Sequence, residues 1–532
     1  MELASQSVAI RFAFSPALTR YTEGMARQLL LPLLLAALAV GPASPGPQVP
    51  QPSAVQSSRP NIVLILTDDQ ELTLGSLDFM PRTRDLIARQ GLTFASHFVP
   101  LSLCCPSRST ILTGQYPHNH RVYTNFPPDG GYERFDELGH EQTTVATALH
   151  AAGYRTALFG KYLNDYPGTE DPSHVPPGWD EWASPVAGSP YAAYHYTLNE
   201  NGKKVKYGGT AADYMTDVLS AKATDFVRRV APTGQPFFLY MATYAPHRPS
   251  TPARRHANLF PALQAPRTPS FNESNVTDKP SRIRAMPRLK TGQIATIDAL
   301  YRKQRQSLQG VDEAVAAVVQ ALQETGQLAN TYVVFTSDNG FHMGQHRLQP
   351  GKYTPYETDI HVPLMIRGPG VPVGGMVTSL TASVDLAPTF AELGATSLPL
   401  APDGRSLVPF LSGQTPAGWR QEVLLEQFAF PPAPPTTDES IEPPDPQDEK
   451  AVTNYPAHLG LRTAGFKFVE YDTGEREVYD LHADPDETNN LRNRLPLSWL
   501  NGLSAIVHSL GRCAGASCRQ LEAQPVPPLP HH

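Results

Sequence analysis

The chain has 532 residues and a formal net charge of −7, with 43 Lys and Arg against 50 Asp and Glu. Hydrophobic residues make up 40% of the chain, which excludes an intrinsically disordered protein, and the slight acidity argues against a general nucleic-acid binder. The 4 cysteines are too few for a disulfide-built scaffold, and their positions do not fit a zinc site made of cysteines.

The N-terminal region predicts entry into the secretory pathway. Residues 29–40 form an apolar run behind Arg27 that is too short to span a membrane and is typical of a signal-peptide core. A buried helix is the alternative. We therefore assign residues 1–43 to a signal peptide and residues 44–59 to a linker. No later run is apolar enough for a membrane span, so we expect a soluble mature protein.

Residues 60–413 alternate strands and helices, which is typical of an α/β catalytic domain with a mostly parallel sheet and helices on both faces. Continuous apolar, β-branched runs predict strands that are buried on both faces, and amphipathic runs that end near Gly predict helices. The strands are expected at residues 61–67, 92–99, 154–159, 237–243, 332–336 and 362–367, and the helices at residues 81–90, 143–152, 212–230 and 295–325.

The pattern changes in the C-terminal part of the chain. Residues 430–449 are dense in Pro and acidic side chains, which indicates a surface loop or a disordered insert. Short alternating runs then predict a small antiparallel sheet and a helix, within a C-terminal α/β subdomain over residues 414–512. We treat residues 513–532 as a tail. The strands of this sheet are expected at residues 459–463, 466–471 and 477–481, and the helix at residues 496–510.

Two sequons and a cysteine pair support an extracytoplasmic location. Asn272 and Asn275 each begin an Asn-X-Ser/Thr motif in a polar stretch that suits an exposed loop, so we expect N-glycosylation there. Cys513 and Cys518 lie close together near the C-terminus and can form a small disulfide in an oxidising compartment.

Carboxylates directly follow two of the predicted buried strands. Asp68 and Asp69 come after the first strand, and ligands of open parallel sheets bind beyond the carboxyl ends of the strands. Asp338 and Asn339 come after another strand. Side by side, these ends would bring together carboxylate and amide oxygens, which suit Ca²⁺ or Mg²⁺ better than Zn²⁺. Turn formation or helix capping is the alternative for each pair alone.

The segment from Leu103 to His118 combines a nucleophile position with an anion-binding geometry. Cys104 stands just ahead of a predicted helix start at Pro106, where backbone N–H groups and the helix dipole favour anions. Arg108 lies one helical turn further on and can return toward Cys104. The pattern alone predicts either a thiolate nucleophile or a buried cysteine beside a helix cap.

This segment resembles a known family. The run CCPSR at residues 104–108, followed by LTG at residues 112–114, matches the Cys-X-Pro-Ser-Arg-X-X-X-Leu-Thr-Gly signature of the type I sulfatases. Further elements of that family follow in the family's order, and the resemblance extends over residues 60–491. These elements are Thr67-Asp68-Asp69, Gly160-Lys161, Pro246-His247, Asp338-Asn339-Gly340 and Lys352 ahead of a Tyr-Glu and Val-Pro-Leu strand.

The resemblance implies a fold and a nucleophile. The fold is an alkaline-phosphatase-like α/β core with a small C-terminal subdomain. In the family, a formylglycine-generating enzyme oxidises the motif cysteine, here Cys104, to Cα-formylglycine. The hydrate of this aldehyde then attacks sulfur, and its second hydroxyl allows the sulfate to be expelled.

The resemblance also implies roles for the other polar residues. One Ca²⁺ ion would orient the hydrate and bind a sulfate oxygen. Arg108, Lys161 and Lys352 would surround the sulfate oxygens, where charge develops in the transition state. Lys161 and His247 would also serve the leaving group. The expected metal ligands are Asp68, Asp69, Cys104, Asp338 and Asn339.

One element departs from the family pattern. Many members read Gly-Lys-Trp-His, whereas this chain reads Gly-Lys-Tyr-Leu-Asn from Gly160 to Asn164. This form resembles the branch of N-acetylglucosamine-6-sulfatases and extracellular endosulfatases, and some arylsulfatases. Asn164 is a candidate substrate contact in place of the missing His. His342 and His346 are further candidates, with surface-loop residues as the alternative.

Taken with the resemblance, the sequence predicts a secreted or lysosomal hydrolase of sulfate monoesters. The expected substrate is the 6-O-sulfate of N-acetylglucosamine in glycans, or an aryl sulfate. The long basic insert of the endosulfatases is absent, which favours an exo-acting or small-substrate enzyme. The alternatives are a phosphomonoester or phosphonate hydrolase of the same superfamily, and a sulfated-glycan-binding protein that keeps an unmodified Cys104.

Overall fold

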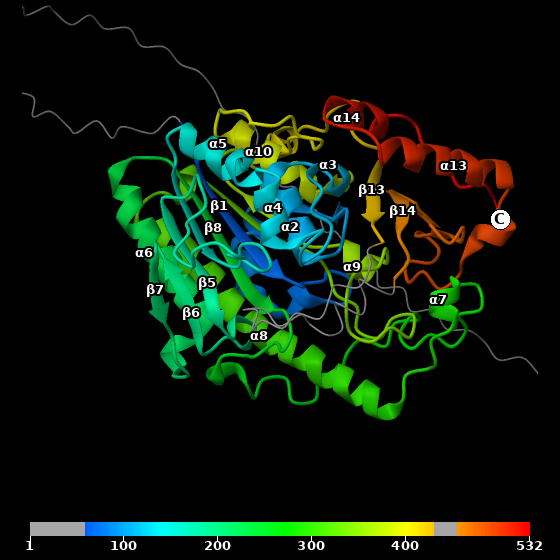
Figure 1. The fold of residues 1–532 in the computed structure, drawn as a ribbon, viewed down its shortest axis with the longest axis horizontal. Helices are drawn as coiled ribbons and strands as arrows, with labels where there is room; N and C mark the ends of the chain where they lie inside the picture. The colour runs from blue at the N-terminus through cyan, green and yellow to red at the C-terminus, as the bar shows by residue number, and fades with distance from the viewer. Residues whose placement is uncertain (1–58, 430–454, 532) are drawn as a thin grey trace, which may run out of the picture. The chain divides into compact units, whose positions relative to one another are not determined.

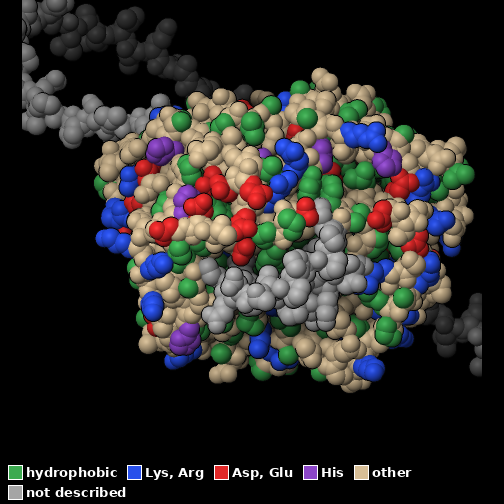
Figure 2. Space-filling view, in the orientation of Figure 1, with side chains coloured by type: hydrophobic (Ala, Val, Ile, Leu, Met, Phe, Trp, Pro, Cys, Tyr) green, Lys and Arg blue, Asp and Glu red, His purple; other side chains and the backbone are tan. Residues whose placement is uncertain are grey.

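The computed structural model describes residues 59–429 and 455–531. The expected signal peptide, most of the expected linker and the Pro-rich segment 430–449 therefore lie outside the described residues. Within the described part of the chain, no helix has the length and apolarity needed to cross a membrane. The face shown in Figure 2 mixes acidic and basic side chains, in keeping with the small net charge of the chain.

A ten-stranded sheet lies at the centre of the fold (Figure 1). From one edge to the other, its strands are β11 (Gly375–Val377), β2 (Leu92–Phe94), β10 (Leu364–Arg367), β9 (Thr331–Ser337), β1 (Asn61–Asp68), β8 (Phe237–Pro246), β4 (Arg155–Gly160), β5 (Glu181–Gly188), β6 (Tyr196–Glu200) and β7 (Lys203–Lys206). The strands β9, β1, β8, β4 and β5 run parallel, whereas β10 and β6 run against them. The predicted α/β class with a mostly parallel sheet is confirmed.

The central strand β1 shows why both faces of the sheet are covered. Ile62, Leu64 and Leu66 pack into a core on one side of the sheet. Val63 and Ile65 pack into a core on the other side, and none of the five side chains has exposed surface. Because both faces are apolar, helices must bury both. Figure 1 shows α2 (Cys104–Thr113), α5 (Val145–Ala151) and α10 (Leu386–Leu393) over one face, and α6 (Met215–Val230) and α8 (Thr291–Glu324) over the other.

The sheet is larger than the sequence pattern predicts. Strand β5 reads EWASPVAG, and Pro185 stands at an irregularity in its pairing with β6, so Pro and Gly hide this strand from pattern analysis. The run at residues 92–99 also divides into β2 and a short strand, β3 (His97–Phe98), which pairs with β12 (Thr381–Ala382) in a separate sheet. Short α-helices in the described chain are α1 (Pro81–Leu86), α3 (Pro117–His120), α4 (Gly131–Glu137), α7 (Ser281–Arg284), α9 (Glu357–Ile360) and α11 (Val408–Leu411).

A second, antiparallel sheet follows in the C-terminal part of the chain. Its strands lie in the order β13 (Glu422–Gln427), β14 (His458–Thr463), β15 (Phe466–Tyr471) and β16 (Arg476–Asp480). Helix α13 (Leu497–Leu510) packs against it through Leu500, Leu503 and Val507. The small antiparallel sheet is thus confirmed, and β13 adds a strand that the sequence pattern does not predict, because all six of its residues are buried and no alternation is visible.

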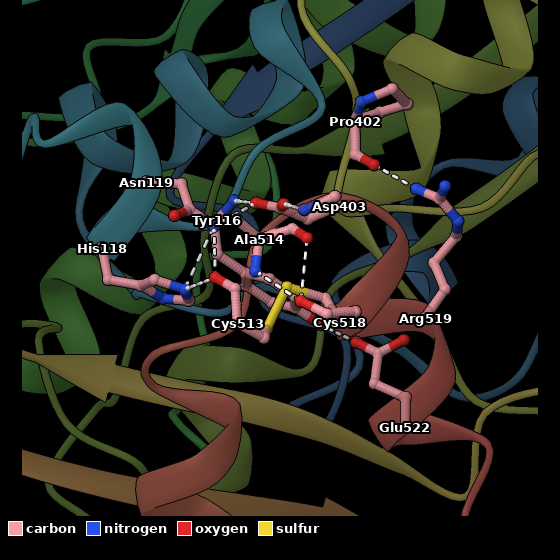
Figure 3. Close-up of a disulfide and its surroundings, with 12 residues drawn as sticks. Tyr116, His118, Asn119, Pro402, Asp403, Cys513, Ala514, Cys518, Arg519 and Glu522 are labelled. Carbon is pink, nitrogen blue, oxygen red and sulfur yellow. Dashed lines mark hydrogen bonds between the residues drawn. A yellow bond between two sulfur atoms is a disulfide. The ribbon is translucent and has the colours of Figure 1, made fainter.

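The last residues of the chain fold back onto the segment that follows α2. Residues 513–532, treated above as a tail, contain helix α14 (Ala516–Glu522) and a disulfide between Cys513 and Cys518 (Figure 3). The backbone carbonyl of Cys513 accepts hydrogen bonds from His118 Nε2 at 2.8 Å and from Asn119 Nδ2 at 3.0 Å. This segment is therefore built into the fold, because its Cys513 carbonyl accepts two hydrogen bonds from the turn after α2, which we call the motif helix.

A buried network of charges lies beside this disulfide. Arg420 pairs with both carboxylate oxygens of Asp385 and donates through Nε to Glu522 at 3.1 Å. Glu522 also accepts a hydrogen bond from the Tyr116 hydroxyl. Asp403 accepts from the backbone N–H of Tyr116 at 2.7 Å. We call these five residues the C-terminal cluster, and each of them has at most 3% of its surface exposed.

Candidate active site

Two pairs of polar residues meet where neighbouring parallel strands end. Strands β1 and β9 pair in register up to Thr67 and Ser337, so Asp68 and Asp69 come to lie beside Asp338 and Asn339. Asn339 Nδ2 donates to Asp69 Oδ1 at 2.6 Å, and the backbone N–H of Asp69 donates to Asp338 Oδ1 at 3.1 Å. Asp69 has a φ of 66°, an uncommon left-handed conformation that turns the chain at the strand end. All four side chains are buried.

The first turn of α2 brings Cys104 to these strand ends. The Cys104 thiol donates to Asp68 Oδ1 at 3.4 Å, and Lys352 Nζ donates to Cys104 Sγ at 2.7 Å. The Ser107 hydroxyl donates to the backbone carbonyl of Asp338, which fixes α2 to the end of β9. Burial and the nearby Asp68 raise the pKa of the Cys104 thiol well above its usual value, against the opposing effect of the lysines. A thiolate nucleophile is therefore not favoured at this position.

Three cations neutralise the three carboxylates, and each is buried. The pairs are Lys161 Nζ with Asp68 Oδ2 at 2.8 Å, Lys352 Nζ with Asp69 Oδ1 at 2.6 Å, and Arg108 Nε with Asp338 Oδ2 at 2.8 Å. Arg108 also donates through Nη1 to the backbone carbonyl of Lys161 at 2.8 Å, which ties the motif helix to the end of β4. We call these six residues, together with Cys104 and Asn339, the strand-end cluster.

The carboxylates of this cluster differ in their affinity for protons. Burial raises the pKa of Asp68, but Lys161, His247 and Arg108 outweigh it and hold that pKa well below its usual range. Burial and the negative charge of Asp68 raise the pKa of Asp338 to about 6. The cluster therefore holds a firmly ionised carboxylate, Asp68, beside one that binds a proton more readily.

His247 reaches the cluster from the end of β8. Its Nδ1 donates to the backbone carbonyl of Arg248 at 2.7 Å, and its Nε2 lies 3.5 Å from Asp69 Oδ2. Its ring packs against Tyr191, with centroids 4.4 Å apart, and the same tyrosine ring lies 5.0 Å from Lys161 Nζ. No pattern in the sequence indicates Tyr191, because it lies just after β5 in a stretch with no strand pattern.

The other candidate substrate contacts have different surroundings. Asn164 is 3% exposed, and its backbone carbonyl accepts a hydrogen bond from Tyr132 N–H at 2.8 Å. His342 is held through Nδ1 by the Asp359 carboxylate at 2.9 Å and lines a cavity that Lys352 also lines. His346 instead donates to Glu273 and stacks on a neighbouring tyrosine ring, with centroids 4.0 Å apart, which indicates a packing role.

The two sequons differ in accessibility. Asn272 is 8% exposed, and its side-chain amide donates to the backbone carbonyl of Leu289 at 3.2 Å while its Oδ1 accepts from the N–H of the same residue. Asn275 is exposed, and its Oδ1 accepts from the Thr277 hydroxyl at 2.8 Å. A glycan on Asn272 would require its contacts to open, whereas Asn275 is free to carry one.

The strand-end cluster contains polar atoms whose hydrogen bonding is incomplete. Within the described part of the chain, nothing donates a hydrogen bond to the buried oxygens Asp69 Oδ2 and Asn339 Oδ1, and nothing accepts one from Arg108 Nη2. Buried polar atoms without partners are costly, so such atoms indicate a missing ligand. Ligand atoms of Asp68, Asp69, Cys104 and His247 all lie within 4.8 Å of one another. The residues fit an oxygen-preferring cation with an anion beside it.

Known proteins resemble this chain in sequence and fold. The chain matches the Sulfatase family over residues 60–395. It is 38% identical to a human protein named N-acetylglucosamine-6-sulfatase over 88% of this chain and 87% of that protein. It is 40% identical to a putative extracellular sulfatase Sulf-1 homolog of Caenorhabditis elegans, over 70% of this chain and 53% of that protein.

The fold is shared with a solved protein crystallised with its substrate, D-glucosamine-2-N,6-O-disulfate. The TM-score is 0.65 at 24% identity, over 85% of this chain and 97% of that one. The family generally implies a metal ion and a formylglycine, and Cys104 is a buried cysteine outside any disulfide. The family match and the extent of the identity lead to one conclusion: this chain belongs to the sulfatase family and is a hydrolase of sulfuric esters.

Proposed function

We propose that this sulfatase removes the 6-O-sulfate from N-acetylglucosamine in glycans. The observation that supports this substrate is the 38% identity to a human N-acetylglucosamine-6-sulfatase, which extends over most of both chains. The Gly160–Asn164 segment supports it, because its Gly-Lys-Tyr-Leu-Asn form resembles that branch of the family. Aryl sulfates are the second candidate. A phosphomonoester or phosphonate substrate and a purely glycan-binding role are not favoured by the family match.

The sulfate group would bind at the first turn of α2. Arg108 offers Nη2 there, and Lys161 and Lys352 bring two more positive charges to the same place. Cys104 Sγ marks the place of the formylglycine oxygens. When present, the formylglycine would supply a hydrated aldehyde with a hydroxyl as nucleophile. Around it, the three cations stabilise the charge that develops on the sulfate oxygens, in a site that excludes water.

Asp68, Asp69, Asp338 and Asn339 would hold the metal ion, which we propose to be Ca²⁺ because the donor atoms are carboxylate and amide oxygens. The ion would supply positive charge to orient the nucleophile and a sulfate oxygen. Asp69 and Asn339 are the readiest ligands, since each keeps a buried oxygen without a hydrogen bond from the described residues. Asp338 already accepts from two backbone N–H groups and Arg108.

His247 is the candidate acid for the leaving group. Its Nδ1 is committed to the carbonyl of Arg248, so Nε2 is the ring atom that faces the cluster. Nε2 is therefore the atom that we propose passes a proton to the departing sugar oxygen. A sugar hydroxyl is a poor leaving group and needs this proton, whereas an activated aryl oxygen needs it little.

The test compares hydrolysis of N-acetylglucosamine-6-sulfate and 4-nitrophenyl sulfate by the wild type and by His247→Ala. We expect the substitution to lower the sugar rate by about 10²-fold to 10⁴-fold and the aryl rate far less. His508→Ala, which changes an exposed histidine on α13, serves as the matched control. Brisk aryl turnover without hydrolysis of any 6-O-sulfated sugar would establish the arylsulfatase alternative instead.

The peptide mass at residue 104 tests the nucleophile. Protein from a host with a formylglycine-generating enzyme should show the aldehyde or its hydrate at Cys104. A fully retained thiol in active protein would refute the mechanism, and a retained thiol in inactive protein that still binds sulfated glycans would favour the binding role.

We further propose that the chain passes through the secretory pathway and is either secreted or delivered to lysosomes. The Cys513–Cys518 disulfide supports an oxidising compartment, and exposed Asn275 offers an acceptor for a glycan. Glycosidase treatment of protein from the native host should increase its gel mobility. The wild type and Asn275→Gln should then differ before this treatment and migrate together after it.

A further inference from the structure

A cavity of about 380 Å³ adjoins the strand-end cluster. It lies between α7, the first turn of α8 and the loop that leads to Lys352, and this volume falls within the range of ligand pockets. No described residue that lines it is acidic. Its polar lining residues include Arg282, Gln293, His342, Arg347, Lys352 and Tyr455.

Two arginines line this cavity, and their guanidinium groups are used differently. Arg347 donates to three backbone carbonyls, through Nε to Glu273 at 2.8 Å, Nη1 to Met286 at 3.1 Å and Nη2 to Ser274 at 2.8 Å. Arg282 forms no hydrogen bond or ion pair with any residue in the described ranges, although its Nε atom is buried. A buried donor without an acceptor is costly, so Arg282 is suited to a ligand that brings the acceptor.

The cavity is connected to the reacting atoms through one residue. Lys352 lines the cavity and also donates to Cys104 Sγ at 2.7 Å, whereas Arg282 stands on α7, a separate element of its wall. A sugar whose sulfate lies at Cys104 can therefore extend into the cavity and bring a second substituent toward Arg282. The planar guanidinium binds oxyanions in a bidentate manner, and none of the described residues that line the cavity has a carboxylate to compete.

We propose that Arg282 recognises a second oxyanion on the substrate, so that the enzyme prefers sugars with two anionic groups over those with the 6-O-sulfate alone. This inference rests on the proposed function and deepens it. The second oxyanion is either a sulfamate on the same glucosamine or the carboxylate of an adjoining uronic acid, since both present oxygens that the guanidinium can bind.

The test is a ratio of kcat/KM values. We compare N-acetylglucosamine-6-sulfate with glucosamine-2-N,6-O-disulfate, and separately with a disaccharide that joins a uronic acid to N-acetylglucosamine-6-sulfate. The wild type should prefer one of the two dianionic sugars, and Arg282→Ala should reduce that preference about tenfold to a hundredfold, mainly through KM. The sugar that shows the preference identifies the source of the second oxyanion.

Arg284→Ala is the matched control, because Arg284 lies on the same short helix, pairs with Glu475 and does not line the cavity. It should keep the wild-type preference. A preference that survives in Arg282→Ala, or that falls equally in both variants, would overturn the proposal.

Equilibrium binding of the same three sugars to Cys104→Ala, with and without Arg282→Ala, separates the two proposals. If the wild type hydrolyses no 6-O-sulfated sugar, the proposed function fails, and these titrations still decide the role of Arg282. A binding preference for a dianionic sugar that depends on Arg282 supports the inference, and equal affinities in both backgrounds refute it.

Discussion

Two buried clusters of charge flank the motif helix, and they differ in how completely their atoms are paired. In the C-terminal cluster, every side-chain oxygen and nitrogen of Asp385, Arg420 and Glu522 has a partner among the described residues. In the strand-end cluster, Asp69, Asn339 and Arg108 each keep a buried polar atom without one. The first cluster is complete as a structural element, whereas the second has polar atoms available for a ligand. Of these two clusters, incomplete pairing, rather than burial or charge, marks the strand-end cluster as the candidate functional site.

The largest expected effect is the loss of activity on changing Asp69. Asp69→Asn keeps the size of the side chain but removes the negative charge that the metal ion and Lys352 require. We expect kcat/KM for N-acetylglucosamine-6-sulfate to fall by at least about a hundredfold, with the far-UV circular dichroism spectrum retained. Activity close to that of the wild type would contradict the assignment of this cluster as the active site.

Removal of the metal ion should have a comparable effect on turnover. Chelation should abolish activity, and Ca²⁺ or Mg²⁺ should restore it better than Zn²⁺, because the ligands are oxygens. Added Ca²⁺ should also raise the melting temperature, since a ligand that binds only the folded state stabilises it. Full activity in protein shown to be metal-free would defeat this prediction.

The opposite result is expected for the C-terminal cluster. Asp385→Ala leaves Arg420 buried with a missing partner, and breaking such a buried pair costs about 3–5 kcal/mol of unfolding free energy. Activity per folded molecule should remain near the wild-type value. Denaturant unfolding measures the free energy of unfolding. Turnover of a sulfate-ester substrate, divided by the concentration of folded protein, measures the activity. Loss of activity in a variant that remains stably folded would contradict the purely structural role of the C-terminal cluster.

Opening the disulfide next to this cluster should have a smaller effect. Cys513 and Cys518 are five residues apart, and closing so short a loop stabilises the folded state by roughly 2 kcal/mol in the loop-entropy description. The double variant Cys513→Ser, Cys518→Ser should therefore melt earlier, with kcat/KM retained. An equal melting temperature for the two proteins would show that the hydrogen bonds to His118 and Asn119 suffice.

A pH-dependent effect is expected for Glu422, which borders the C-terminal cluster. Its Oε2 has no hydrogen-bond partner among the described residues, and burial together with nearby Glu522 raises its pKa to about 8. Because the folded state binds this proton more tightly, its contribution to stability is fully present below the unfolded pKa of roughly 4.3 and is lost as the pH rises through about 8.

Glu422→Gln removes this titration. The variant should lose less stability than the wild type between pH 5 and pH 9, as judged from the melting temperature at each pH. Identical pH profiles of the two proteins would show that the carboxyl group is ionised in the folded state.

The sequence predicts the parts of this molecule in which local chemistry is strong. The strand at residues 61–67 is continuous and apolar, so both its burial and the position of Asp68 and Asp69 beyond its end follow from the pattern. The placement of Cys104 at a helix start follows in the same way. That these residues lie in contact depends on the register of β1 and β9, which local patterns cannot give.

Other features depend on contacts between distant segments and leave no local signal. Tyr191 reaches His247 from a stretch with Pro and Gly where no strand is predicted. The structure also separates His342 from His346, which the sequence could not do, because His342 lines the cavity beside Lys352 and His346 pairs with Glu273. Arg420 and Glu522 are 102 residues apart, so nothing in the sequence around either one indicates a buried pair.

The burial of Cys104 has a consequence for the biogenesis of the enzyme. The residue has no exposed surface, and its helix is fastened to the end of β9 by Ser107. Under the proposed conversion of Cys104 to formylglycine, an oxidising enzyme would reach this side chain only while the chain is still open, and a molecule that folds first would keep its thiol for as long as it stays folded. The yield of active protein would then depend on the rate of modification relative to the rate of folding. Slower folding, for example at lower temperature, would increase the active fraction, whereas stabilising the native state afterwards would not.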